Sequence, residues 1–178
     1  MTDECIYVGV REHVIKPADS DHENITILVT ICADGTSISL VVIYKGEVHC
    51  QQPWVLEKGY VNGKFGLEWI KHFDKTTKAK VAGCHHLLLI DGDVSYYTFT
   101  LLDYAYQNHI LVLCYPLHAT HIYQGLDIVM FSILKHSWTE VQWKFKQKGA
   151  KVTKSNFLSM YAHAHLEALT TDNIKAAF

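Results

Sequence analysis

Hydrophobic residues along this chain form short β-rich runs in its first half and helical repeats in its second. Residues 2–9, 25–32 and 37–44 have the β-branched and aromatic content of strands. The last two runs are joined by a short Asp-Gly connection, which predicts an antiparallel hairpin. Residues 11–24 and 47–64 are polar or broken by proline and glycine, which predicts irregular structure. Three strands are therefore expected before the first helix.

The middle of the chain carries the strongest strand signal. Residues 87–90 read Leu-Leu-Leu-Ile, an unbroken apolar run typical of a strand buried on both faces of a sheet. Residues 95–108 repeat apolar side chains every three to four positions, which predicts a helix, and residues 110–114 form a second apolar run. Strand, helix and strand at this spacing predict a βαβ unit with its two strands parallel.

The remaining repeats predict further helices. Residues 65–73 fit a short amphipathic helix, and the lysines that follow it, up to Lys80, are interpreted as a solvated face. Helical patterns also cover residues 126–145 and 156–178, the last one broken near residues 170–173. The expected fold class is α/β, a ribonuclease-H-like mixed sheet: three antiparallel strands, then a parallel βαβ unit, with C-terminal helices.

The length and composition are those of a folded globular protein. The chain has 178 residues, 49% of them hydrophobic, which predicts one folded domain over residues 1–178. No apolar run approaches the length of a membrane helix, and no secretory leader is visible at the start. The five cysteines are an odd, scattered set and are expected to be reduced. A net charge of -2 means that any contact with nucleic acid needs a local basic patch.

Three aspartates occupy comparable places: Asp3 in the first predicted strand, Asp91 directly after the central run, and Asp127 where a helix begins. Mg²⁺ and Mn²⁺ prefer oxygen ligands, and carboxylates that converge from different elements can hold two such ions for phosphoryl transfer. Simpler interpretations stay open, because Asp91-Gly92 is also an ordinary turn and Asp127 could serve the helix dipole.

Several motifs follow one another in a definite order. They are Asp3-Glu4, residues 25–46, residues 88–92, residues 113–127 with His118 and His121, and residues 173–178. In this order they resemble the catalytic domain of pogo/Tigger-type DDE superfamily endonucleases, transposases of the mariner group whose domain also occurs in centromere protein B relatives. The resemblance is greatest to the fungal branch.

The resemblance implies that Asp3, Asp91 and Asp127 are the catalytic residues and the ligands of two Mg²⁺ or Mn²⁺ ions, for DNA strand cleavage and transfer. It implies DNA as the partner and residence in the nucleus, and leaves a homodimer open. No membrane and no small-molecule cofactor are expected. It also leads us to expect a catalytic domain that lacks the family's N-terminal DNA-binding region.

The chain departs from the family pattern next to Asp91. The family reads Asp-Gly-His, two residues and a second His, whereas this chain has Asp93 and Tyr96 at the two histidine positions. An additional acid there could hold a metal in the wrong geometry or repel DNA phosphates. Two hypotheses follow: a metal-dependent DNA endonuclease, and a decayed or domesticated domain that binds DNA or protein without cleavage.

Other candidate sites have simpler alternatives. Cys84-His85-His86 could bind zinc, but no second pair stands at finger spacing. His118 and His121 could position a phosphate or a metal, although histidine is a poor ligand for Mg²⁺, or they could make structural hydrogen bonds. Trp54 is interpreted as a packing anchor. Aromatic residues 138, 143 and 145, interleaved with lysines, could form a DNA-backbone surface or a core stripe with solvated lysines.

Overall fold

The computed structural model describes residues 6–9, 13–15, 25–44, 47–50, 63–90, 98–115, 125–149 and 152–178. The described strands are β1 (Ile6–Gly9), β2 (His13–Ile15), β3 (Ile25–Leu28), β4 (Thr30–Cys32), β5 (Val41–Tyr44), β6 (Glu47–Cys50), β7 (His86–Ile90) and β8 (Ile110–Cys114). The described helices are α1 (Gly63–Val81), α2 (Phe99–Gln107), the π-helical turn η2 (Leu126–Met130), α4 (Phe131–Gln147), α5 (Lys154–Ala168) and α6 (Thr171–Ala176).

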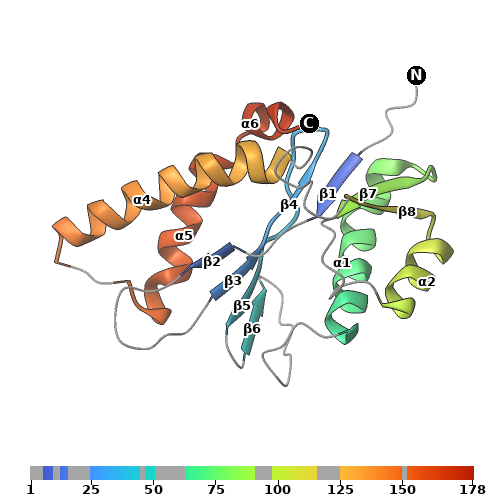
Figure 1. Cartoon of the computed structure of the whole chain (residues 1–178), viewed down its shortest axis with the longest axis horizontal. Coiled ribbons are helices and arrows are strands. Elements are labelled where there is room, and N and C mark those ends of the chain that lie inside the picture. Colours follow the sequence, from blue (N-terminus) through green and yellow to red (C-terminus); the bar gives the residue numbers. More distant parts are fainter. Residues whose placement is uncertain are drawn as a thin grey trace.

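The strands form two four-stranded sheets rather than the single mixed sheet that the sequence predicts. The first has the order β4-β1-β7-β8, and the second has the order β2-β3-β5-β6. The segment expected as one strand over residues 25–32 belongs to both, because the strand pattern is interrupted at Val29 between β3 and β4. Figure 1 shows this segment crossing the middle of the molecule.

The predicted strand pairings are confirmed where the structure describes them. β3 pairs antiparallel with β5, which confirms the hairpin, and β7 pairs parallel with β8 from His86 opposite Ile110 to Ile90 opposite Cys114. Two expectations of irregular structure are wrong. β2 and β6 lie within the segments predicted as loops and add an antiparallel strand to each side of the β3–β5 pair.

Helix α1 is much longer than the sequence predicts. It runs on from Phe73 to Val81, so that the lysines interpreted as following a short helix belong to its last three turns. The reason lies in Asp74 and Thr77, which look like polar breaks in the pattern but are 6% and 0% exposed. Their polar groups are hydrogen-bonded inside the fold, so the buried face continues through them.

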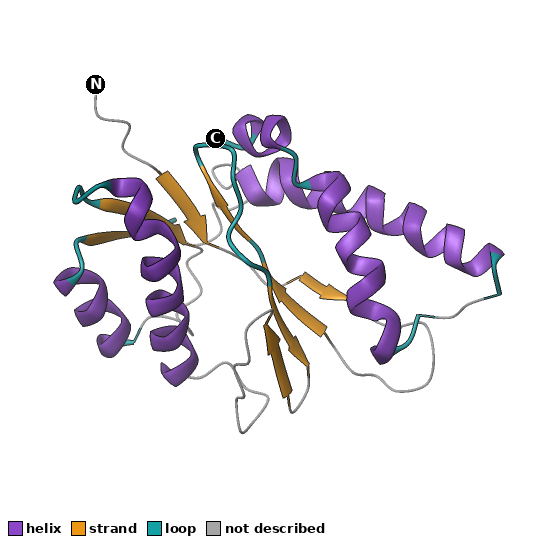
Figure 2. Ribbon diagram, turned by 180° about the vertical axis from the view of Figure 1, so that it is seen from behind, coloured by secondary structure: helices purple, strands orange, loops and turns teal. Residues whose placement is uncertain are grey.

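Two hydrophobic cores lie on opposite sides of the strands. Ile27, Val29 and Ile31 alternate along β3 and β4 and pack against α4, α5, α6 and η2, whereas Cys32, Leu88 and Ile90 face the core formed with α1 and α2. This follows from the two-residue period of a strand. Figures 1 and 2 show α1 and α2 on one side of the strands and α4 and α5 on the other.

Candidate functional site

The carboxyl end of β7 carries the position where the sequence predicts a metal ligand. β7 ends at Ile90, which lies between β1 and β8 in the sheet, and the N–H of Tyr115 donates to the carbonyl oxygen of Ile90 over 3.0 Å. That bond extends the β7–β8 pairing to the last residue of β7. Asp91 itself lies outside the described residues. It directly follows β7, which is paired with β1 on one side and with β8 on the other.

The second predicted ligand lies in the π-helical turn η2. The structure describes the backbone of Asp127 there and not its side chain. Its neighbours Leu126 and Met130 are almost fully buried. Single π-helical turns within a longer helix are often found at functional sites. The predicted helix start is confirmed at Leu126, and it takes π-helical rather than α-helical form.

Gly125 fixes the start of η2 against the end of the chain. A Cβ atom at this position would overlap the carbonyl oxygen of Ala177, although the backbone of Gly125, at φ −59° and ψ −25°, suits any residue. The glycine is therefore required by the close approach of α6 and not by its conformation. Gly125 directly precedes the helical pattern expected over residues 126–145, and no local pattern indicates this role.

The elements that lead to Asp91 and Asp127 share one core. Leu89, two residues before Asp91, packs against the cluster that contains Leu126 and Met130. Because Leu126 immediately precedes Asp127, β7 and η2 border the same hydrophobic core. Asp91 and the side chain of Asp127 lie outside the described residues, so their convergence stays a prediction.

The register of β1 bears on the third predicted ligand. β1 runs parallel to β7, with Ile6 opposite Leu87 and Gly9 opposite Ile90. In sequence, Asp3 precedes the amino end of this ladder, whereas Asp91 follows its carboxyl end. An extended chain advances at most about 3.6 Å per residue, so Asp3 can meet Asp91 only if the chain doubles back along β1. Asp3 lies outside the described residues.

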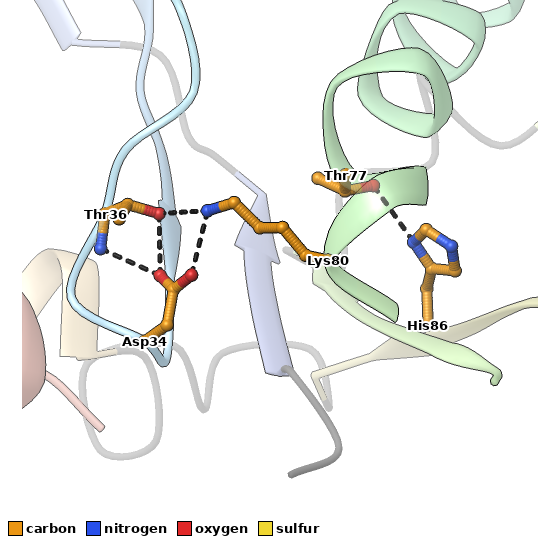
Figure 3. A network of polar contacts seen from close by, with 5 residues as sticks. All are labelled: Asp34, Thr36, Thr77, Lys80 and His86. Atoms are coloured by element: carbon orange, nitrogen blue, oxygen red, sulfur yellow. Dashed lines mark hydrogen bonds and ion pairs between the residues drawn. The ribbon is translucent and has the colours of Figure 1, made fainter. Parts of the chain in front are cut away.

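A polar network joins the hairpin turn to the end of α1 (Figure 3). Lys80 donates to Asp34 Oδ2 over 2.8 Å and also to the hydroxyl of Thr36, which itself donates to Asp34 Oδ1 over 2.6 Å. Partial burial raises the pKa of Asp34, but the hydrogen bonds from Lys80 and Thr36 outweigh burial and hold that pKa below its ordinary value. Lys80 is exposed, as expected of a solvated face, and it also links the hairpin turn to α1.

A second polar pair, also drawn in Figure 3, lies between α1 and β7. Thr77 Oγ1 donates to the carbonyl oxygen of Phe73 over 2.8 Å, so it accepts from Nδ1 of His86, 3.0 Å away. Burial lowers the pKa of His86, and the charge of Asp74 opposes this only in part. Asp74 also accepts from the hydroxyl of Tyr104 over 3.2 Å. These groups hold α1 in place against β7 and α2.

This arrangement does not support a zinc site at Cys84-His85-His86. His86 is 3% exposed and bound to Thr77, whereas Cys84 and His85 are exposed. Within the described part of the chain, no three histidine, cysteine, aspartate or glutamate side chains are grouped to hold a metal ion. Asp3, Asp91 and the side chain of Asp127 are outside that search, as are His118, His121 and Trp54.

Of the aromatic residues on α4, one lies in the core and another is exposed beside lysines, so each of the two predicted roles applies to one of them. Trp138 is 7% exposed and packs against Phe157 and Tyr161, as expected of a core residue. Trp143 is 60% exposed and is followed by the exposed residues Lys144, Lys146 and Lys148. We call these four residues the α4 basic surface.

Comparison with known proteins gives a consistent result. A profile of the DDE superfamily endonucleases matches residues 22–178. A curated relative described as an MFS-type transporter, clz9 of Cochliobolus lunatus, is 29% identical over 94% of this chain, which spans only 19% of that protein. None of the described helices is both long enough and apolar enough to cross a bilayer.

Solved structures show the same fold. The catalytic domain of Mos1 transposase, solved with Raltegravir and Mn, matches 97% of this chain and 74% of its own at a TM-score of 0.65 and 13% identity. A Mos1 paired-end complex with the left transposon end matches 97% of this chain and 55% of its own, at a TM-score of 0.53 and 14% identity. At such identity the likeness establishes a ribonuclease-H-like transposase fold and no more.

Proposed function

The chain belongs to the DDE superfamily endonucleases, and we propose that it is a transposon-derived nuclease domain that binds DNA and cleaves and joins its strands with divalent metal ions. The observation that carries this proposal is the family match over residues 22–178, together with a sheet whose β7 leads directly into Asp91. The Mos1 catalytic domain with the same fold was solved with Mn and with Mg.

The proposed metal ligands are Asp3, Asp91 and Asp127. Their donor atoms are all carboxylate oxygens, which suit Mg²⁺ or Mn²⁺ and not softer ions. The shared core of β7 and η2 supports a meeting of Asp91 and Asp127, whereas the register of β1 makes Asp3 the weakest member.

In the proposed reaction, a water oxygen forms a bond to a DNA phosphorus while the bond from phosphorus to the 3′ oxygen breaks. The products are a 3′-hydroxyl, which takes up the proton, and a 5′-phosphate. The bound ions would supply an activated water and charge stabilisation for the leaving oxygen. The role of this chain is positional: β7 and η2 hold the acids, and the rigid core limits their movement.

DNA contact is proposed for the α4 basic surface. An exposed tryptophan can stack on a base, and three ammonium groups within five residues can neutralise phosphates. The chain as a whole has a net charge of -2, so this concentration of positive charge is local. The DNA-bound Mos1 complex supports DNA as the class of partner.

Cleavage is tested with supercoiled plasmid in Mg²⁺ or Mn²⁺. We expect the purified chain to nick the plasmid, and Asp91→Asn or Asp127→Asn to reduce nicking to background with unchanged circular dichroism. Asp103→Asn is the matched control, because Asp103 is an exposed acid on α2 that accepts only from Gln107 among the described residues. An intact plasmid with both ions would refute cleavage.

The second candidate function is DNA binding without cleavage. The β1–β7 ladder favours it, because the ladder begins at Ile6, after Asp3 in sequence, and ends at Ile90, before Asp91. Asp93 and Tyr96 in place of two histidines favour it as well. It predicts that the chain binds fluorescently labelled DNA, as measured by anisotropy, and that Asp91→Asn leaves the affinity unchanged. The double variant Lys146→Gln, Lys148→Gln should reduce the slope of log K against log salt concentration by about 2. The double variant Lys75→Gln, Lys78→Gln on α1 should leave that slope unchanged. Nicking by the wild-type chain would rule this candidate out.

Finer features belong to the same proposal. The ordered motifs and the Cochliobolus lunatus relative support the pogo/Tigger-type, centromere protein B-like fungal branch. We further propose residence in the nucleus and a homodimer as the assembly. A fluorescent fusion and sedimentation of the purified chain test these two statements separately.

A further inference from the structure

The parallel pairing of β7 and β8 places two imidazoles side by side. His85 directly precedes β7 and His109 directly precedes β8, and the ladder begins with His86 opposite Ile110. The rings of His85 and His109 have centroids 5.1 Å apart and planes inclined by 75°. Both residues are exposed, so an ion from solvent can reach them.

The backbone fixes both positions. The N–H of His86 donates to the carbonyl oxygen of His109 over 2.9 Å. His109 has φ 58°, in the left-handed region that residues other than glycine seldom adopt, and the preceding Asn108 is held by its side-chain bond to the carbonyl oxygen of Tyr104. The backbone of both residues is therefore in place before a ligand binds, which lowers the entropic cost of binding.

The ring separation suits chelation of one metal ion. With a zinc ion about 2.1 Å from each ligating nitrogen, and each ring centre about 1.1 Å behind its nitrogen, tetrahedral geometry puts the two centres about 5 Å apart. The observed 5.1 Å agrees with this value. Imidazole is a preferred ligand of Zn²⁺, Ni²⁺ and Cu²⁺, and a poor one for Mg²⁺.

We propose that His85 and His109 form a two-histidine site for a transition-metal ion such as Zn²⁺ or Ni²⁺. Water completes the coordination, because no third histidine, cysteine or carboxylate joins them among the described residues. The site lies at the amino ends of β7 and β8, whereas Asp91 follows the carboxyl end of β7. It is independent of the proposed catalytic ions.

The test uses the full chain without a histidine tag, stripped of metal by a chelator, and titrated with ZnCl₂ or NiCl₂ in a calorimeter. We expect one ion per chain and a higher midpoint of thermal unfolding, since an ion that binds the native state stabilises it. His85→Ala or His109→Ala should weaken binding at least about tenfold, by analogy with the loss of supporting residues around metal sites.

His163→Ala is the control, because His163 is exposed on α5 and is outside the pair. Asp91→Asn should bind Zn²⁺ as the wild type does, and MgCl₂ should not compete. These two results separate this site from the proposed nuclease centre, whatever the outcome of the plasmid assay. The proposal is overturned if neither His85→Ala nor His109→Ala weakens binding, or if Cys84→Ser abolishes it.

Discussion

The two helical layers both pack on hydrophobic cores, but they differ in the contacts that are added to those cores. On one face, polar pairs join α1 to its neighbours: Lys80 with Asp34, Thr77 with His86, and Asp74 with Tyr104 of α2. On the other face, α4 and α5 meet through aromatic rings. The ring centroids of Trp138, Phe157 and Tyr161 lie 5.5 to 6.0 Å apart.

The difference teaches how each layer positions its part of the candidate site. Hydrogen bonds are directional, so the polar pairs set the register of α1 against β7, the strand that leads to Asp91. Aromatic packing is less directional, and the layer that carries Asp127 has in addition a close backbone contact between Gly125 and Ala177, directly after α6.

The largest expected effect comes from Gly125→Ala, which breaks the close contact of the aromatic layer. The added methyl group meets backbone that cannot rotate away, so we expect a loss of about 3 kcal/mol in the free energy of unfolding, at the upper end for overpacking. Urea denaturation measures it.

Gly149→Ala is the control for this change. Gly149 has φ 72° and open space around a Cβ atom, so its substitution costs only backbone strain, about 1 kcal/mol. Equal effects of the two substitutions would show that crowding at α6 is not the cause.

Sequence patterns predicted the local elements of both layers and missed the contacts that join them. Period-two and period-3.6 repeats are local, so the hairpin, the βαβ unit and the C-terminal helices could be predicted. The extension of α1 could not, because Asp74 and Thr77 look solvated until Tyr104 and His86 are seen to bind them. The division into two sheets at Val29 carries no local signal.

The candidate site shows the same limit. Asp91 was predicted from the apolar run before it, and the structure confirms the strand that it follows. Its convergence with Asp3 and Asp127 stays a prediction, because convergence is a property of the whole fold. Gly125 had no signal of its own, since the residue that excludes a side chain there lies 52 positions away in the chain.

The next effect in size is expected from Thr77→Val, which removes one polar pair of the α1 layer. His86 would keep its buried ring without the hydroxyl that accepts from Nδ1, at a cost of about 2 kcal/mol. Thr76→Val is a matched control: Thr76 makes the same bond to the carbonyl four residues earlier but is exposed. If both variants unfold at the same urea concentration, His86 does not depend on Thr77.

Thr77→Val should also change the pH dependence of stability. Burial holds the pKa of His86 below its ordinary value of 6.5, so the unfolded chain binds the proton more readily. Stability is therefore fully present above pH 6.5 and declines as the pH falls toward the lowered pKa. The decline should be altered in Thr77→Val and unchanged in Thr76→Val, as measured by urea midpoints from pH 7.5 to 5.

A smaller effect is expected from Lys80→Met, which removes the ion pair with Asp34. The pair is about one-third exposed, so its loss should cost about 1 kcal/mol or less, and 1 M NaCl should reduce the difference. Because the folded pKa of Asp34 is lowered, the contribution is present above pH 3.8 and is lost as the pH falls through the lowered value. Lys71→Met, which breaks a more exposed pair with Glu68, should cost less.

The smallest expected effect has the opposite sign and tests the aromatic layer. Tyr161 is 1% exposed, and its hydroxyl has no hydrogen-bond partner among the described residues. Burial without a partner also raises the pKa of Tyr161. Tyr161→Phe keeps the ring contacts and removes the unsatisfied group, so we expect a gain of about 0.5 kcal/mol in the free energy of unfolding. Tyr104→Phe should instead lose about 1 kcal/mol, because its hydroxyl donates to Asp74. A loss of stability in both variants would mean that the two layers are held by the same kind of contact.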